Sequence, residues 1–166
     1  AERGKRVVVR MEEPSASEEY VTVVDNKGRE KIQRVEYIVH DVRGERVYVT
    51  ADGLAYAQDS LEAKEFYYLV DELDRIPDIL SRPDIVVHDP ISPEDTLIYY
   101  KRIYIESQRV HQLIAAVVKF RRGVKFFYNM HPQESGKVKG YRRSLPPRIW
   151  YINPRRKPRD FGIQSR

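Results

Sequence analysis

Leu97-Ile-Tyr-Tyr-Lys-Arg-Ile-Tyr-Ile105 opens the stretch that decides the fold, and two further runs follow it, Leu113-Ile-Ala-Ala-Val-Val-Lys-Phe120 and Val124-Lys-Phe-Phe-Tyr-Asn-Met130. The first and third runs are rich in β-branched and aromatic residues, and the middle run contains paired valines. Such residues suit a pleated, half-buried surface. The sequence therefore predicts three consecutive antiparallel strands, a β-meander.

The connection between the second and third strands sets their register. The three residues 121–123, Arg-Arg-Gly, place a glycine where a positive φ is needed, which is typical of a hairpin closure. A reversal about the middle residue would put Leu113 opposite His131. We therefore expect Glu106, His111 and His131 to gather at one end of the sheet, and the two turn arginines at the other end.

The rest of the chain adds a β-rich beginning and one helix. Residues 5–11, 21–32 and 35–50 read as strands joined by turns. Asp59, followed three residues later by glutamate, resembles a capping box that opens a helix, and Pro77 ends it. The apolar face of this helix comprises Leu61, Phe66, Leu69, Val70, Leu73 and Ile76.

These elements predict an α+β fold in which one main helix packs on the meander and a β-rich N-terminal part precedes it. We expect three parts: residues 1–58, β-rich; 59–136, helix plus meander; and 137–166, a basic C-terminal arm. A short extended piece is expected at 85–88. Residues 149–152 read as a fourth sheet strand or as a hook that packs Trp150 onto the body.

Composition excludes several kinds of site. The 166 residues contain no cysteine, which excludes disulfides, thiolate metal sites and a cysteine nucleophile. No His or Asp cluster has the spacing of metal ligands, and no Gly-rich phosphate loop occurs. No apolar run is long enough to cross a membrane, and no basic leader opens the chain. We expect a cytoplasmic protein with no cofactor and no metal.

Charge is distributed unevenly. Residues 137–166 contain ten Lys or Arg and one acid, a net charge of +9, so the preceding 136 residues carry 20 basic and 24 acidic groups, a net −4. A basic arm with interleaved aromatics and prolines is typical of a nucleic-acid contact. The alternative is a solvated tail or one that neutralises an acidic body. The expected nucleic-acid-binding residues are Arg109, Tyr128, Lys137, Lys139, Arg142, Arg143, Arg155, Arg156 and Lys157.

The stretch from about residue 79 to 132 resembles the phage-associated branch of the barnase, EndoU, colicin and RelE-like nuclease superfamily. The resemblance is carried by Arg-Pro-Asp-Ile-Val at 82–86, Leu-Ile-Tyr-Tyr-Lys-Arg at 97–102, Ala-Val-Val-Lys at 116–119 and Phe-Phe-Tyr at 126–128. This chain has Phe-Tyr-Asn at 127–129, where that pattern tends to have a small hydroxyl residue near an aromatic. The resemblance implies a nuclease-like domain.

Metal-independent RNA cleavage needs a base for the 2′-hydroxyl, an acid for the leaving 5′-oxygen and cations at the phosphate. His111 and His131 are the candidates for base and acid, and Glu106 for a base or for orienting a histidine. Tyr128 or Tyr104 would stack a base. The competing hypothesis is a non-catalytic binding or assembly module whose basic arm binds nucleic acid or an acidic protein. A homodimer through an uncovered strand edge is compatible with either hypothesis.

Overall fold

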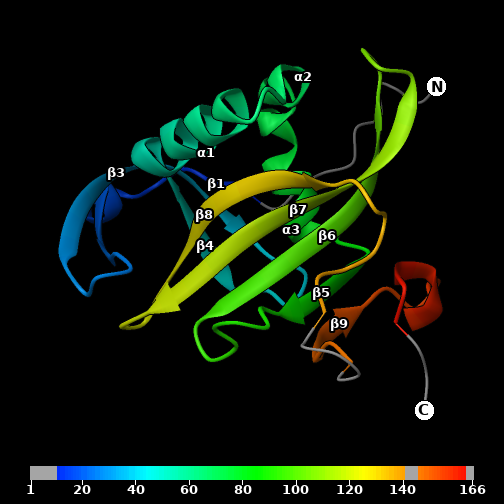
Figure 1. Ribbon diagram of the computed structural model, residues 1–166. Coiled ribbons are helices and arrows are strands. Elements are labelled where there is room, and N and C mark those ends of the chain that lie inside the picture. Colours follow the sequence, from blue (N-terminus) through cyan, green and yellow to red (C-terminus); the bar gives the residue numbers. More distant parts are fainter. Residues whose placement is uncertain (1–10, 141–145, 164–166) are drawn as a thin grey trace.

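The computed structural model describes residues 11–140 and 146–163, and one curved sheet runs through both ranges (Figure 1). Its strands are β1 (Met11–Glu12), β2 (Tyr20–Val24), β3 (Glu30–His40), β4 (Arg46–Thr50), β5 (Ile85–His88), β6 (Thr96–Ile105), β7 (Val110–Arg121), β8 (Val124–Gln133) and β9 (Ile149–Ile152). The order is β1-β3-β4-β8-β7-β6-β5-β9, and β2 pairs with the outer half of β3. The broad α+β class is therefore confirmed.

The meander of β6, β7 and β8 is confirmed, but its register differs from the expected one. The β7–β8 turn contains two residues rather than three, Arg122 and Gly123, whose φ angles are 53° and 78°. Two consecutive positive φ values define the hairpin turn that matches the natural twist of the strands. A bulge near Val117 adds a further offset, so that Leu113 lies opposite Gln133 rather than opposite His131.

The β-rich N-terminal part shares the sheet of the meander. β4 runs parallel to β8, with Tyr48 opposite Phe126. Directly after β4 the chain enters α1 (Ala51–Ala63), which crosses β8. The boundary expected between residues 58 and 59 falls inside this helix, and the two parts that it would separate belong to one sheet.

The expected single helix from Asp59 to Ile76 is wrong, because the chain forms several shorter pieces. α1 begins eight residues earlier, where the side chain of Thr50 accepts a hydrogen bond from the Gly53 amide. Glu65 adopts a positive φ of 64° and interrupts the helical path. Pro77 lies in the first turn of a new helix, where a missing N–H costs nothing. The further pieces are α2 (Tyr67–Val70), α3 (Ile76–Ser81) and the 3-10 turns Ala16–Glu18, Leu73–Arg75 and Pro158–Phe161.

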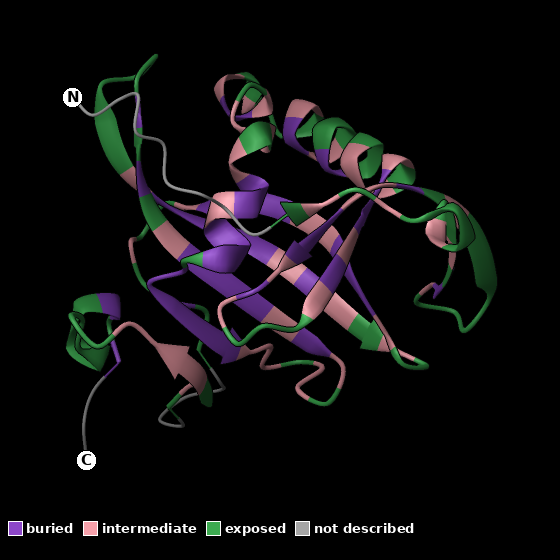
Figure 2. Ribbon diagram, turned by 180° about the vertical axis from the view of Figure 1, so that it is seen from behind, coloured by how far each residue is buried: buried purple, intermediate pink, exposed green. Residues whose placement is uncertain are grey.

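Two hydrophobic cores lie on opposite faces of the sheet. The helices cover one face, and Figure 2 shows α3 in front of the sheet when the molecule is seen from behind. The core on this face includes Leu61, Leu69, Ile79, Tyr99, Ile114 and Phe127. The core on the opposite face comprises Ile85, Val87, Ile98, Tyr100, Leu113, Ala115, Val138, Phe161 and Ile163. Val138, Phe161 and Ile163 follow the meander, so part of the basic arm packs on the sheet.

The C-terminal segment descends beside β6 and β5 and adds β9 to the edge of the sheet (Figure 1). Residues 149–152 are therefore both a sheet strand and a hook that packs Trp150 onto the body, as predicted. The ring centroids of Trp150 and Tyr99 are 6.1 Å apart. The extended piece at 85–88 is confirmed as β5. Across the described ranges, none of the helices combines the length and the apolar character that crossing a membrane requires.

Gly53→Ala tests the close approach of α1 to β8. A Cβ at this position would lie 3.0 Å from the backbone oxygen of Phe127 and 3.1 Å from the Thr50 hydroxyl oxygen. Although alanine favours a helix, we expect this overlap to lower the free energy of unfolding by about 1–2 kcal/mol in urea denaturation. Gly140→Ala is the control, because nothing lies within 4 Å of its added Cβ. A more stable Gly53→Ala protein would contradict the contact.

Candidate nucleic-acid interface

The sheet face opposite the helices presents three rows of side chains across β6, β7 and β8. Residues directly opposite one another on neighbouring strands point to the same face. The rows are first Tyr100, Ala115 and His131, then Arg102, Leu113 and Gln133, and last Tyr104 and His111. Tyr100 and Ala115 of the first row belong to the second core, whereas the last row is exposed at the end of the β6–β7 hairpin.

Asp84 fixes two arginines at the edge of this face. Its carboxylate accepts a hydrogen bond from the backbone N–H of Arg102 at 2.8 Å and another from Nε of Arg156 at 3.3 Å. Its own amide and carbonyl bond to Tyr100 and Asn153. Asp84 is 5% exposed, so this carboxylate is a structural brace between β5, β6 and the C-terminal segment.

The residues that follow β8, 134–140, cross this face and are called the crossing segment, and its two lysines contribute further positive charge. The backbone N–H of Lys139 donates to the hydroxyl of Tyr100, which places this residue above the first row. Its ammonium group lies 3.4 Å from the carboxylate of Asp89 and is half exposed. Lys137 packs its side chain against Gly162. We call Arg102, Lys137, Lys139 and Arg156 the cationic face.

An aromatic pair lies at the exposed end of the same face. The rings of Tyr104 and His111 are 5.0 Å apart with an interplanar angle of 56°. Arg102 precedes Tyr104 by two residues, so both side chains point to the same side. Glu106 and Arg109 occupy the tight turn directly beyond, and the Arg109 amide donates to the Glu106 carbonyl. Glu106, Arg109 and His111 are therefore close to one another, and all three are exposed.

His131 lies elsewhere on the face. It is opposite Ala115, four positions along β7 from His111 and one strand further across. At about 3.3 Å per residue and 4.8 Å per strand, their Cα atoms are roughly 14 Å apart. Both histidines therefore lie toward the expected end of the meander, opposite the Arg122–Gly123 turn, but their separation keeps the two imidazoles from meeting at a single point. Burial, with the positive charges of Lys64 and Lys139, lowers the pKa of His131 to about 4, so its ring is neutral at neutral pH.

The other expected binding residues are dispersed. Arg155 and Lys157 are exposed beside the last 3-10 turn, where Lys157 donates its backbone N–H to Asp160. Tyr128 lies outside the rows, against Tyr56 of α1 and under the ammonium group of Lys119. Arg142 and Arg143 lie outside the described residues. In the part of the chain that the structure describes, no group of three or more His, Asp or Glu side chains is suited to hold a metal ion.

Two features of this face, the role of Arg102 and the Asp84 brace, were not among the site residues predicted from the sequence, whereas Tyr104 was predicted as a stacking residue. Arg102 and Tyr104 stand at alternate positions of a predicted strand, so the two-residue period already placed them on one face. The Asp84 brace had no such signal, because its partners lie 18 and 72 residues away in the chain.

No protein-family model matches the chain, and no match occurs among curated proteins or among solved structures.

His131 makes the protein sensitive to acid. Its folded-state pKa of about 4 is below the ordinary value of 6.5, so the unfolded chain binds this proton first as the pH falls. The contribution of neutral His131 to the free energy of unfolding is fully present above pH 6.5 and is lost as the pH falls from about 6.5 to 4. The total loss is roughly 3 kcal/mol. We expect His131→Asn to lose less stability than the parent between pH 7 and pH 4.5 in urea denaturation. Equal losses would show that His131 is solvated.

Proposed function

We propose that this protein binds single-stranded nucleic acid, foremost RNA, on the sheet face opposite the helices. The observation that carries the proposal is the position of the cationic face beside the exposed rings of Tyr104 and His111. Cations neutralise phosphates, and an aromatic ring offers a stacking surface to any unpaired base. The resemblance of residues 79–132 to RNA-directed nucleases favours RNA over DNA.

The geometry assigns different parts of the strand to different side chains. Arg102 has no ion-pair partner among the described residues, so its guanidinium is available for a phosphate. Arg156 and Lys139 already have carboxylate partners in Asp84 and Asp89, which hold them in place and reduce their net attraction for phosphate. Tyr104 would stack a base at the hairpin end.

Arg102→Glu tests this surface. We expect the dissociation constant for a labelled single-stranded RNA to rise about tenfold or more at low salt, because a phosphate contact is replaced by repulsion. The slope of log K against log salt should fall by about 0.7 for the lost contact. Fluorescence anisotropy measures both quantities.

Lys27→Glu is the matched control, because it makes the same charge change in the exposed β2–β3 turn, away from the rows. Equal weakening by both variants would mean that only net charge matters and would reject the proposed surface.

A second candidate function is metal-independent cleavage of that RNA, and the contact between His111 and Tyr104 beside Arg102 favours it. His111 would take the proton of the 2′-hydroxyl as that oxygen attacks phosphorus and the bond from phosphorus to the 5′-oxygen breaks, and water would protonate the leaving 5′-oxygen. Glu106 in the adjacent turn is an alternative base. Arg102 would neutralise charge on the phosphate. His131, with its lowered pKa, holds no proton to give to the leaving oxygen near neutral pH.

His111→Ala separates the two candidates. If the protein cleaves RNA, the rate in excess chelator should fall by about 10²–10⁴-fold, while affinity for a non-cleavable strand changes little. His131→Asn should retain most of the rate at neutral pH. Parent protein that leaves RNA intact in chelator under these conditions would reject cleavage and leave the binding proposal standing.

A further inference from the structure

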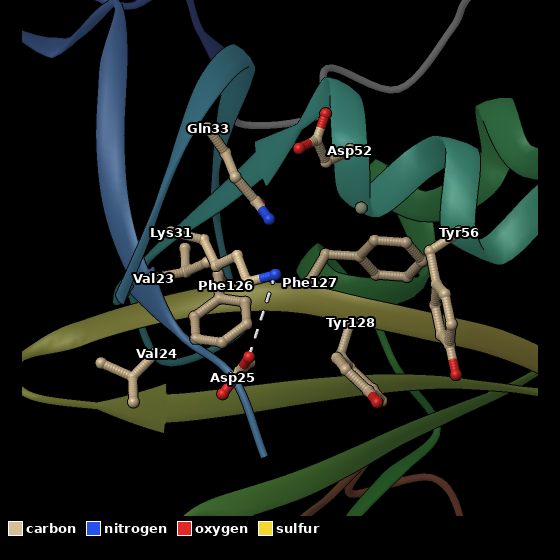
Figure 3. Close-up of a pocket in the computed structure, with 11 residues that line it drawn as sticks. Val23, Val24, Asp25, Lys31, Gln33, Asp52, Tyr56, Phe126, Phe127 and Tyr128 are labelled. Atoms are coloured by element: carbon tan, nitrogen blue, oxygen red, sulfur yellow. Dashed lines mark ion pairs between the residues drawn. The ribbon is translucent and has the colours of Figure 1, made fainter. Parts of the chain in front are cut away.

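A cavity of about 240 Å³ lies between the β2–β3 hairpin, the start of α1 and β8 (Figure 3), and no residue of the cationic face lines it. The cross-strand pair Val23 and Lys31 and the next inward residue of β3, Gln33, point toward it. This volume is below the range of about 300–1,000 Å³ that suits drug-sized ligands, so the cavity fits a single ring.

The floor and one wall of the cavity are apolar or aromatic. Val23, Phe126 and Phe127 are at most 5% exposed and form the floor. The rings of Tyr56 and Tyr128 are 5.3 Å apart and form the wall. A planar ring would gain both hydrophobic burial and edge or face contacts with these aromatics.

The side chain of Gln33 presents an oriented donor. The Thr50 hydroxyl oxygen accepts from the Gly53 amide, so its own proton goes to Oε1 of Gln33 at 2.7 Å. The amide group is thereby fixed with Nε2 directed into the cavity, where it has no hydrogen-bond partner among the described residues (Figure 3). A ligand in this cavity therefore needs a carbonyl acceptor facing Gln33.

The charges around the cavity favour a neutral ligand. Lys31 supplies a second donor, and its ammonium group is 4.0 Å from the carboxylate of Asp25. Asp52 adds another carboxylate at the rim. Two carboxylates against one ammonium group disfavour an anionic ring and favour one that also carries an N–H.

We propose that this cavity binds a uracil-type ring: a planar six-membered heterocycle with carbonyl acceptors and a ring N–H. Gln33 Nε2 and Lys31 donate to the carbonyl oxygens, and Asp52 accepts from the ring N–H. Adenine lacks a carbonyl oxygen and is a poorer match for these donors. The ring belongs either to a free nucleoside or to an unstacked base of a bound RNA strand, and only the second source rests on the proposed function.

Gln33→Glu is the sharpest test, because it keeps the oxygen that Thr50 needs and replaces the donor by an acceptor. We expect millimolar uridine to perturb NMR signals of Tyr56, Tyr128 and Phe126 in the parent protein, with adenosine several-fold weaker. Gln33→Glu should weaken uridine binding about five- to tenfold. Gln108→Glu makes the same change in the exposed β6–β7 turn and should leave uridine binding unaltered.

Thermal unfolding of each variant checks that it is folded, and Lys31→Met is a second variant that removes the other donor from a half-exposed position. Absence of uridine perturbation at these signals, or equal affinity in Gln33→Glu and the parent, would overturn the proposal. Titration with an oligouridylate identifies the source of the ring. If Gln33→Glu lowers the affinity for the oligouridylate, the ring is a base of a bound strand. If Gln33→Glu loses uridine binding but keeps its affinity for the oligouridylate, the ring belongs to a free nucleoside. Uridine binding in the cavity does not depend on Arg102, whose variant tests the proposed function. One proposal can therefore be rejected while the other stands.

Discussion

A buried ion pair between Asp41 and Lys125 joins the N-terminal half of the chain to the meander. The Asp41 carboxylate accepts from Lys125 Nζ at 2.8 Å and from the Tyr99 hydroxyl at 2.5 Å, and from the backbone amides of Arg43 and Glu45 in its own turn. A buried charge is costly unless hydrogen bonds satisfy it, and losing one partner costs about 3–5 kcal/mol. β4 and β8 share one bridge pair, and this network adds a buried contact between the β3–β4 turn and the meander.

That junction determines which face of the sheet is available. The chain passes from β4 directly into α1, so the helices collect on one face and complete the core there. The opposite face has no helix among the described residues except the short turn that contains Phe161, and the crossing segment covers only its central part. The cations of that segment are thereby brought beside Arg102, while Tyr104 and His111 stay exposed beyond it. The surface that we propose for nucleic-acid binding thus results from incomplete coverage of a two-faced sheet.

The strands of the meander were predictable because their apolar residues follow a two-residue period, which depends only on local sequence. The register of β7 on β8 was not predictable, because Arg122 adopts a positive φ that its side chain does not favour. A bulge near Val117 then shifts the pairing again. Each offset is one residue, yet together they move His131 away from Leu113. The helix was misplaced because the strand-end Thr50 acts as its cap, and a strand-ending threonine has no distinctive pattern. The candidate site was foreseen only in part: the exposed group of Glu106, Arg109 and His111 is local, whereas the Asp84 brace depends on long-range contacts.

The charge states on the sheet face bear on which function it performs. Cleavage by two imidazoles needs one neutral and one protonated ring at the same pH. His131 supplies the neutral form alone near neutral pH, and Arg102 cannot release its proton, so another group or water must protonate a leaving oxygen. Binding needs only fixed positive charge and a stacking surface, both of which this face presents near neutral pH. The proposed binding uses residues that are already in position, whereas the proposed cleavage requires a further proton donor, so binding is the more economical of the two proposals.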